Sequence, residues 1–241
     1  MKEHKHFNMR RLLTVVLMLA LVLSTAATGY AADLTESVCE NPDPGKVIKT
    51  DWTNFRGNNT HNAVTKNPVP TKASEAALLW ATKSGTGYGA QAVGSPILVD
   101  GYLYFHSGRK IVKINPKNGE VAASAEIAGS NQYTTNPLAY GEGMIFVLLD
   151  DGKVQALNAK TLESLWISEE LGGQNISPLI YHNGYIYTGT WKAEDKDGVY
   201  YCLSVTDEDA SKTDEIKHPM WQIKHKGGFY WAGAYATDNY V

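Results

Sequence analysis

Cysteine is scarce in this chain, which has two, Cys39 and Cys202, among its 241 residues. Small exported domains held by disulfides carry far more cysteine per residue, so a disulfide framework is not indicated. The two thiols could still pair, but Cys39 lies in a polar N-terminal stretch and Cys202 lies in a strand pattern. We therefore predict that Cys202 is a buried, inert side chain.

The motifs of several enzyme classes are also missing. The seven histidines form no His-Glu-x-x-His pattern and no Cys/His cluster, so no metal site is expected. The sequence contains no Gly-x-Ser-x-Gly and no Cys-x-x-Cys-His, the patterns of serine hydrolases and of c-type haem attachment. Asp195-x-Asp197-Gly198 resembles half of a calcium loop, but the later bidentate glutamate is absent and a solvated hairpin tip is the simpler interpretation. We predict no catalytic residue and no enzymatic activity.

Long apolar runs are confined to the N-terminus. Residues 1–32 combine a positive start that includes Arg10 and Arg11, an apolar run from Leu12 to Leu23, and small residues before position 33. This pattern is typical of a Sec-type secretory signal peptide, and a retained N-terminal anchor is the alternative. We predict an exported protein that is extracellular, on the cell surface or periplasmic, with no transmembrane segment once the signal peptide is cleaved.

An excess of positive charge is absent as well. Without residues 1–32, the chain holds 18 basic and 24 acidic side chains, a net charge of −6. A mildly acidic chain argues against nucleic acid as a partner, because such partners need a basic surface.

Strands and tight turns are what the chain does contain. Residues 136–166 divide into apolar or alternating runs at 137–140, 144–149 and 153–158, followed by a strand that ends at Trp166. Asp150-Asp151-Gly152 predicts a tight hairpin, because Asp and Gly tolerate the positive φ that such turns require. Four antiparallel strands in about thirty residues cannot bury both faces alone, so copies must stack.

Copies of this unit are present on both sides. Residues 94–104 and 176–187 repeat the opening of the central copy, and Pro96, Pro137 and Pro178 recur at a spacing of 41 residues. A period of about 40 to 45 residues with four strands per unit indicates a β-propeller. We predict an all-β fold of four-stranded antiparallel blades.

The expected domains follow from these copies. A signal peptide (1–32) and a leader arm with an irregular segment (33–70) precede the propeller repeats (71–241). Blades are expected near residues 92–127, 133–169 and 174–224, and a further blade begins at 231. Residues 206–217 are an acidic insertion in the third copy, and residues 76–81 are expected to form an outer strand that ends near Trp80.

About three blades plus partial flanking blades make an incomplete propeller, since closure usually takes roughly four to eight. The chain is therefore expected to be an N-terminal fragment whose missing blades belong to a longer chain. The alternative is a small open array completed by self-association.

Two stretches resemble a known family. The pattern Gly-x-Val-x-Ala-Leu-Asn-Ala-Lys-Thr-x-x-x-Leu-Trp, from Gly152 to Trp166, is similar to the repeat of PQQ-like β-propellers, which include quinoprotein dehydrogenases and the BamB-type assembly lipoprotein. Residues 51–57 are similar to the Trp…Phe-Arg-Gly opening found before the first blade of many such proteins. The central copy departs from the family at Leu162, and the first copy has Ala123 where tryptophan is expected.

Candidate site residues come from the loops that enter the innermost strands and from the outer tryptophans. Amide and aromatic side chains in these loops suit a neutral polar ligand, and the alternative is that they make turns and pack between blades. The ligand candidates are Gln91, Gln132, Tyr133, Gln174, Asn175, Tyr230 and Trp231. The residues expected to dock neighbouring blades are Trp80, Trp166 and Trp221, whose rings are large enough to bury ~150–250 Å² each.

The resemblance implies PQQ as a cofactor, but the residues do not support it. Quinoprotein dehydrogenases hold this tricarboxylate with cationic and calcium-bearing sites beside an adjacent-cysteine disulfide, and the entry loops contain no basic residue and no such cysteine pair. We therefore expect no cofactor and a binding or scaffold module, with a protein or polysaccharide of the cell envelope as partner. The alternatives are a remnant of a PQQ-dependent dehydrogenase and an extracellular glycan-binding propeller.

Overall fold

The computed structural model describes residues 52–58, 61–64, 70–83, 94–129, 138–213, 215–231 and 233–241. The predictions about the signal peptide, most of the leader arm and Cys39 lie outside these residues. Within these residues, helix is confined to short 3₁₀ turns such as η2 (Ala73–Glu75), and none of the described segments is a helix that could span a membrane.

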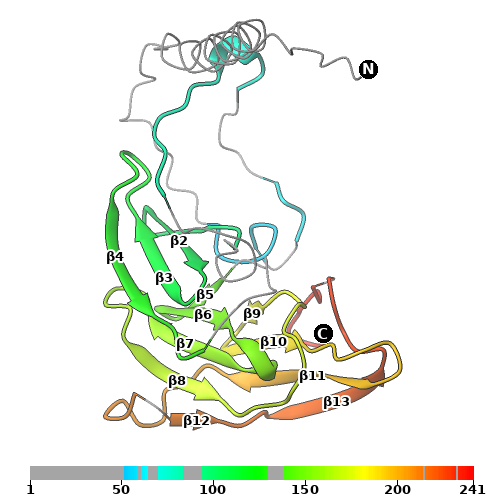
Figure 1. Ribbon diagram of the computed structural model, residues 1–241. Helices are drawn as coiled ribbons and strands as arrows, with labels where there is room; N and C mark the ends of the chain where they lie inside the picture. Colours follow the sequence, from blue (N-terminus) through cyan, green and yellow to red (C-terminus); the bar gives the residue numbers. More distant parts are fainter. Residues whose placement is uncertain are drawn as a thin grey trace, which may run out of the picture. The chain divides into compact units, whose positions relative to one another are not determined.

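Strands form three sheets (Figure 1). The first, called blade 1, has the order β1-β2-β3-β4. Its strands are β1 (Ile97–Val99), β2 (Tyr102–Ser107), β3 (Lys110–Ile114) and β4 (Val121–Glu126). Each strand is antiparallel to the one before it, so the sheet is a simple meander.

Blades 2 and 3 repeat this meander. Blade 2 contains β5 (Ala139–Gly141), β6 (Met144–Leu148), β7 (Val154–Asn158) and β8 (Ser164–Ser168). Blade 3 contains β9 (Ile180–His182), β10 (Tyr185–Gly189), β11 (Asp197–Ser204) and β13 (Trp221–Lys226). The predicted all-β propeller blades are confirmed, and the described residues supply three blades rather than a closed ring.

Side chains of blade 2 alternate between its two neighbours, as the period of two in a strand requires. Phe146 of β6 joins a core with Tyr201 and Leu203 of blade 3. Ile145 and Val147, from the same strand, join a second core that includes residues of blade 1 such as Ile97. Blade 2 therefore has both faces buried, and this explains why all five residues of β6 are inaccessible.

The turn between β6 and β7 has the backbone geometry that its sequence predicts. Asp151 and Gly152 both have positive φ, 62° and 74°. The connection is a short 3₁₀ turn, η3 (Asp150–Gly152), rather than a two-residue hairpin. Gly152 is required there, because a Cβ would come within 3.0 Å of the backbone of Gly172.

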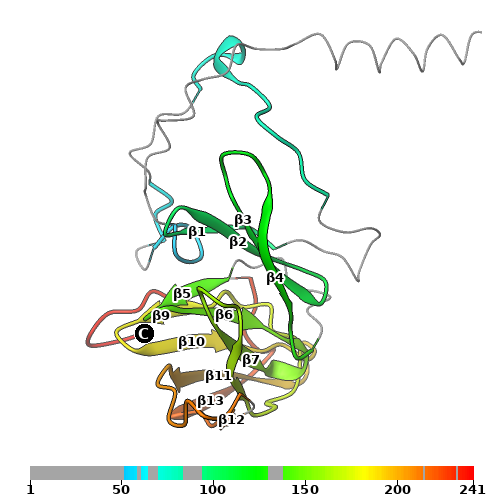
Figure 2. The ribbon, with the colours of Figure 1, turned by 90° about the vertical axis from the view of Figure 1, so that its left-hand side faces the viewer.

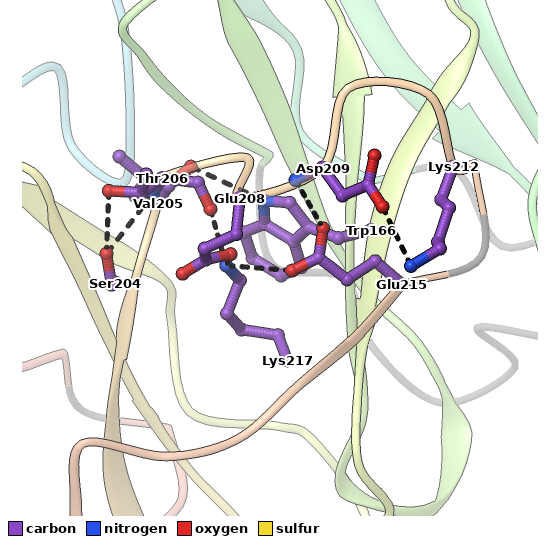
Figure 3. Close-up of polar contacts among 9 residues, drawn as sticks. All are labelled: Trp166, Ser204, Val205, Thr206, Glu208, Asp209, Lys212, Glu215 and Lys217. Atoms are coloured by element: carbon purple, nitrogen blue, oxygen red, sulfur yellow. Dashed lines mark hydrogen bonds and ion pairs between the residues drawn. The ribbon is translucent and has the colours of Figure 1, made fainter.

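The acidic insertion contains a strand that the sequence analysis misses. β12 (Glu215–Lys217) leaves blade 3 and pairs in parallel with β8, so it becomes the fifth strand of blade 2. Figures 1 and 2 both show this short strand beside the outer edge of that sheet. Lys217 is buried there, and its ammonium meets Glu208, Glu215 and the carbonyl of Thr206 over the ring of Trp166 (Figure 3).

Two N-terminal segments also differ from expectation. The outer strand expected at residues 76–81 does not form, since this segment has no strand partner in the described part of the chain. Trp80 nevertheless packs on Phe105 and Val112 of blade 1. The opening at residues 52–57, expected to be irregular, pairs with inner strands: Trp52 bridges Leu98, and the carbonyl of Thr53 accepts from Tyr140 at 2.8 Å.

Candidate functional site: an aromatic corner on blade 3

Three loops of blade 3 meet in a group of aromatic side chains. One loop leads into β9, one joins β10 to β11, and one follows β13. The first two are tied by an isolated bridge in which Gln174 and Trp191 exchange backbone hydrogen bonds of 2.7 and 3.0 Å. The third is anchored by the Phe229 N–H, which donates to the carbonyl of Thr190 at 3.0 Å.

We call Trp191, Tyr230 and Trp231 the aromatic corner. The Tyr230 ring stands edge-on to Trp191 at 5.9 Å and to Trp231 at 6.1 Å between centroids. Trp231 is 62% exposed and Tyr230 37%, so two faces of large rings reach solvent. Ring pairs in this arrangement are favourable beyond their burial, which helps to hold exposed rings in place.

Polar groups surround these rings. The Tyr230 hydroxyl donates to Glu194 at 3.4 Å, and Gln174 and Lys192 are exposed on the adjoining loops. The indole N–H of Trp191 is buried and has no hydrogen-bond partner among the described residues. An unsatisfied buried donor is costly, so this group requires a water or a ligand acceptor.

Glycines allow the loops to approach Trp191. A Cβ on Gly173 would lie 2.8 Å from the carbonyl oxygen of Trp191, and one on Gly228 would lie 3.0 Å from its Cα. Both glycines have positive φ, 89° and 67°. The glycine pairs of the entry loops are therefore needed to form the corner as well as to make turns.

The ligand candidates from the sequence separate into groups. Gln174, Tyr230 and Trp231 come together at the corner. Asn175, beside them in sequence, is buried, and its amide donates to the carbonyls of Leu149 and Lys153 at 3.1 and 2.6 Å. Its oxygen accepts from Tyr201, so Asn175 fastens blade 3 to the β6–β7 turn of blade 2.

The remaining ligand candidates, Gln91, Gln132 and Tyr133, lie outside the described residues. Sequence reasoning missed Trp191 and Glu194, because it considered only loops that enter the innermost strands. Trp191 lies two residues beyond the end of β10, and an aromatic residue placed just after a strand is the signal that could have identified it.

Two of the three outer tryptophans donate their indole N–H to a backbone carbonyl of a blade. Trp166 donates its indole N–H to the Val205 carbonyl of blade 3 at 3.4 Å, and Trp80 donates to the Pro116 carbonyl of blade 1 at 2.7 Å. Leu203 and Ile114 occupy matching register positions in blades 3 and 1. Val205 and Pro116 each lie two residues beyond them, so the two acceptors are equivalent. Trp221 instead lies 42% exposed on the outer face of blade 3.

That outer face carries a pocket of about 470 Å³. It is lined mainly by apolar and aromatic groups: Tyr200, Trp221, Ile223, Gly228, Phe229, Tyr230, Gly233, Ala234 and Val241. Tyr187 and Cys202 lie on the same face, where burial raises the pKa of Tyr187 to about 12 and that of the Cys202 thiol to about 11. Cys202 is a free, buried thiol, and its raised pKa keeps it protonated and unreactive at neutral pH.

The described residues contain no cluster of three or more His, Cys, Asp or Glu side chains suited to a metal ion. The corner offers flat apolar ring surface, three loops held by backbone hydrogen bonds, and a few amide, hydroxyl and charged groups at its margin. Such a surface suits contact with a polar ligand.

Comparison with known proteins explains the repeats. The family model described as "Outer membrane protein assembly factor BamB" matches residues 77–194. This stretch, just under half of the chain, is similar to the propeller repeats of that family. No curated protein matches the chain in sequence.

Two solved dehydrogenases share the fold. A europium-containing methanol dehydrogenase aligns with a TM-score of 0.56 and 17% identity, over 73% of this chain and 32% of its own. The quinohemoprotein alcohol dehydrogenase ADHIIG from Pseudomonas putida HK5 gives 0.55 and 16%, over 73% and 26%. BamB from Moraxella catarrhalis gives 0.42 and 21%, over 57% and 36%. This chain thus spans about a third of these proteins or less, and at such identities the likeness concerns the fold alone.

Proposed function

We propose that this PQQ-like propeller is an exported, non-catalytic binding module and that it contacts its ligand through the aromatic corner. The observation that carries the proposal is the exposure of Tyr230 and Trp231 beside Trp191. Large rings held at a loop junction are costly to expose without use, and exposed aromatic residues mark binding surfaces more often than chance.

The chemistry of the corner favours a neutral polar ligand. Sugar rings place flat apolar faces against aromatic rings and direct hydroxyl groups to the margin, where Gln174, Lys192 and Glu194 are exposed. Glycan chains of the cell envelope, which an exported protein meets, have this chemistry.

The residues of the corner do not fit PQQ. This cofactor carries three carboxylates, and the family's dehydrogenases hold it with cationic groups and calcium. The cations of the β10–β11 loop, Lys192 and Lys196, lie among the carboxylates of Glu194 and Asp195, and Glu194 already accepts from Tyr230. The corner therefore supports binding rather than quinone chemistry.

A glycan array tests the proposal directly. The chain should bind a subset of neutral glycans, and Trp231→Ala should weaken that binding tenfold or more. Gln174→Ala should weaken it less, since Gln174 is held through its backbone. Tyr185→Ala, which replaces an exposed aromatic residue at the opposite end of β10, is the matched control and should leave glycan binding unchanged. Equal binding by wild type and Trp231→Ala would refute the site.

The competing function is a PQQ-dependent oxidoreductase. Incubation of the chain with PQQ and calcium, followed by an assay of dye reduction with alcohols, separates the two. We expect no reduction above the PQQ-calcium mixture alone, and turnover by the chain would overturn the proposal.

A further inference from the structure

The outer edge of blade 3 differs from that of blade 2 in what covers it. In the described residues, β13 ends its sheet and pairs only with β11, whereas β8 at the matching position is covered by β12. All six residues of β13 are exposed. We call residues 221–226 the β13 edge.

The ladder shows which backbone groups of this edge are open. The Gly227 N–H donates to the Lys196 carbonyl at 2.9 Å, one position beyond the Asp197–Lys226 pair. Because hydrogen-bonded pairs alternate in an antiparallel ladder, the backbone groups of Gln222, Lys224 and Lys226 point away from β11. An edge with outward N–H and C=O groups is a template for an added strand.

The two faces of the β13 edge have opposite character. Trp221 and Ile223 line the 470 Å³ pocket, next to Tyr200, whose buried hydroxyl has no partner among the described residues. Lys224 and Lys226 alternate with them on the other face and make no ion pair within the described part of the chain. A strand laid along this edge would therefore meet apolar surface on one side and positive charge on the other.

Blade 2 demonstrates that an edge in this position accepts a strand. Glu215 and Lys217 of β12 pair with Trp166 and Ser168 of β8, and the segment that delivers them is rich in acidic residues (Figure 3). Trp166 itself packs against blade 3, where it is fully buried and donates its indole N–H to the carbonyl of Val205. Trp221 occupies the equivalent place in blade 3 and is 42% exposed.

We propose that the β13 edge is a docking site for an extended segment of a partner protein, in which acidic and apolar residues alternate. The segment pairs with Gln222, Lys224 and Lys226 through its backbone. Its acidic side chains face the two lysines, and its apolar side chains enter the pocket beside Trp221 and Tyr200. Main-chain pairing supplies affinity in this mode of recognition, and the alternate side chains supply specificity. This surface is distinct from the glycan-binding face proposed above, although Tyr230 borders both.

The test uses the full chain and three labelled nonapeptides. One alternates Asp or Glu with Val or Leu, one has the same composition in blocks, and one replaces the acidic residues by lysine. Fluorescence anisotropy should show the alternating acidic peptide binding at least tenfold tighter than either of the others. Amide exchange of Gln222, Lys224 and Lys226 should slow when it binds. Equal affinities, or no binding of the alternating peptide, would overturn the proposal.

Variants separate backbone pairing from charge. Gln222→Pro removes an outward N–H and should weaken binding tenfold or more, whereas Gln222→Ala should leave it unchanged. If Gln222→Pro disturbs folding, as near-ultraviolet circular dichroism would reveal, Lys224→Glu with Lys226→Glu leaves the backbone intact. That double variant should prefer the lysine peptide over the acidic one.

Two further outcomes would assign the edge to another occupant and contradict the proposal. One is that the wild-type chain forms a dimer in analytical ultracentrifugation and the Gln222→Pro variant does not, which would assign β13 to a second copy of this chain. The other is a glycan array in which Gln222→Pro, but not Gln222→Ala, abolishes binding. The glycan result with Trp231→Ala is independent of both, so failure of one proposal leaves the other standing.

Discussion

Blades 2 and 3 carry the same meander and a tryptophan at the same position of the outer strand, but their surroundings differ. Trp166 of blade 2 is inaccessible, with an acceptor for its indole N–H and the ammonium of Lys217 5.5 Å from its ring centre. Trp221 of blade 3 is 42% exposed and contacts Tyr187 and Tyr200 of its own sheet. A blade's stability in this fold therefore depends on what lies against it, as expected where each repeat contacts only its neighbours.

The largest expected effect is on the two tryptophans themselves. Trp166→Ala should lower the free energy of unfolding by ~3–5 kcal/mol, the usual cost of truncating a buried aromatic residue. Trp221→Ala should cost at most roughly half of that, because the hydrophobic contribution scales with the area removed from water. Denaturant unfolding of both variants measures the difference, and equal losses would mean that burial by the neighbouring blade is not what stabilises blade 2.

A smaller effect is expected at the strand that covers blade 2. Lys217 has 5% of its side chain exposed and is held by Glu208, Glu215 and a carbonyl, so Lys217→Ala leaves these acceptors without their donor. We expect a loss of roughly 1–3 kcal/mol, the cost of an unsatisfied buried group. Lys212→Ala is the matched control: Lys212 also pairs with an acidic residue of the insertion but is 62% exposed, so the loss should be below roughly 1 kcal/mol. Similar losses in the two variants would show that β12 contributes nothing beyond surface charge.

The smallest effect is a dependence on pH at the same cluster. The hydrogen bond from Lys217 lowers the pKa of Glu208 below its ordinary 4.5, whereas the neighbouring Glu208 raises the pKa of Glu215. A lowered carboxyl pKa contributes stability above the unfolded value that is lost as the pH falls through the folded value. Glu208→Gln should therefore be less stable than wild type at pH 7, and the difference should shrink as the pH falls below 4.5 and vanish once the folded carboxyl is protonated. Thermal unfolding of both proteins from pH 7 down to pH 2 measures this difference. A difference that does not shrink over that range would exclude the ion pair as its source.

The repeat and its strands could be predicted from the sequence because their signals are local. Alternation and turn residues place β6, β7 and β10, and the positive φ of Asp151 and Gly152 follows from residue type. The equivalence of Trp80 and Trp166 follows from their spacing, although residues 76–81 form no strand. Their hydrogen bonds to carbonyls of the following blade could not be read from spacing alone.

What could not be predicted depends on contacts distant in sequence. β12 is three residues long and has no period of its own, so its pairing with β8 arises only once blades 2 and 3 are stacked. By residue type Asn175 is expected to form a turn. Once the blades are stacked, however, its amide donates to two carbonyls at the β6–β7 turn. Trp191 joins the aromatic corner because Gly173 and Gly228, 55 positions apart in the chain, both pack closely against its backbone.

Native-state hydrogen exchange of the whole chain tests the central claim most directly, since it reports the stability of each blade separately. If neighbouring blades stabilise one another, the amides of β6 and β7 should exchange only through global unfolding, those of β8 should be protected by β12, and the outward amides of β13 should exchange fastest. Equal protection of β8 and β13, or slower exchange in β13, would contradict the account.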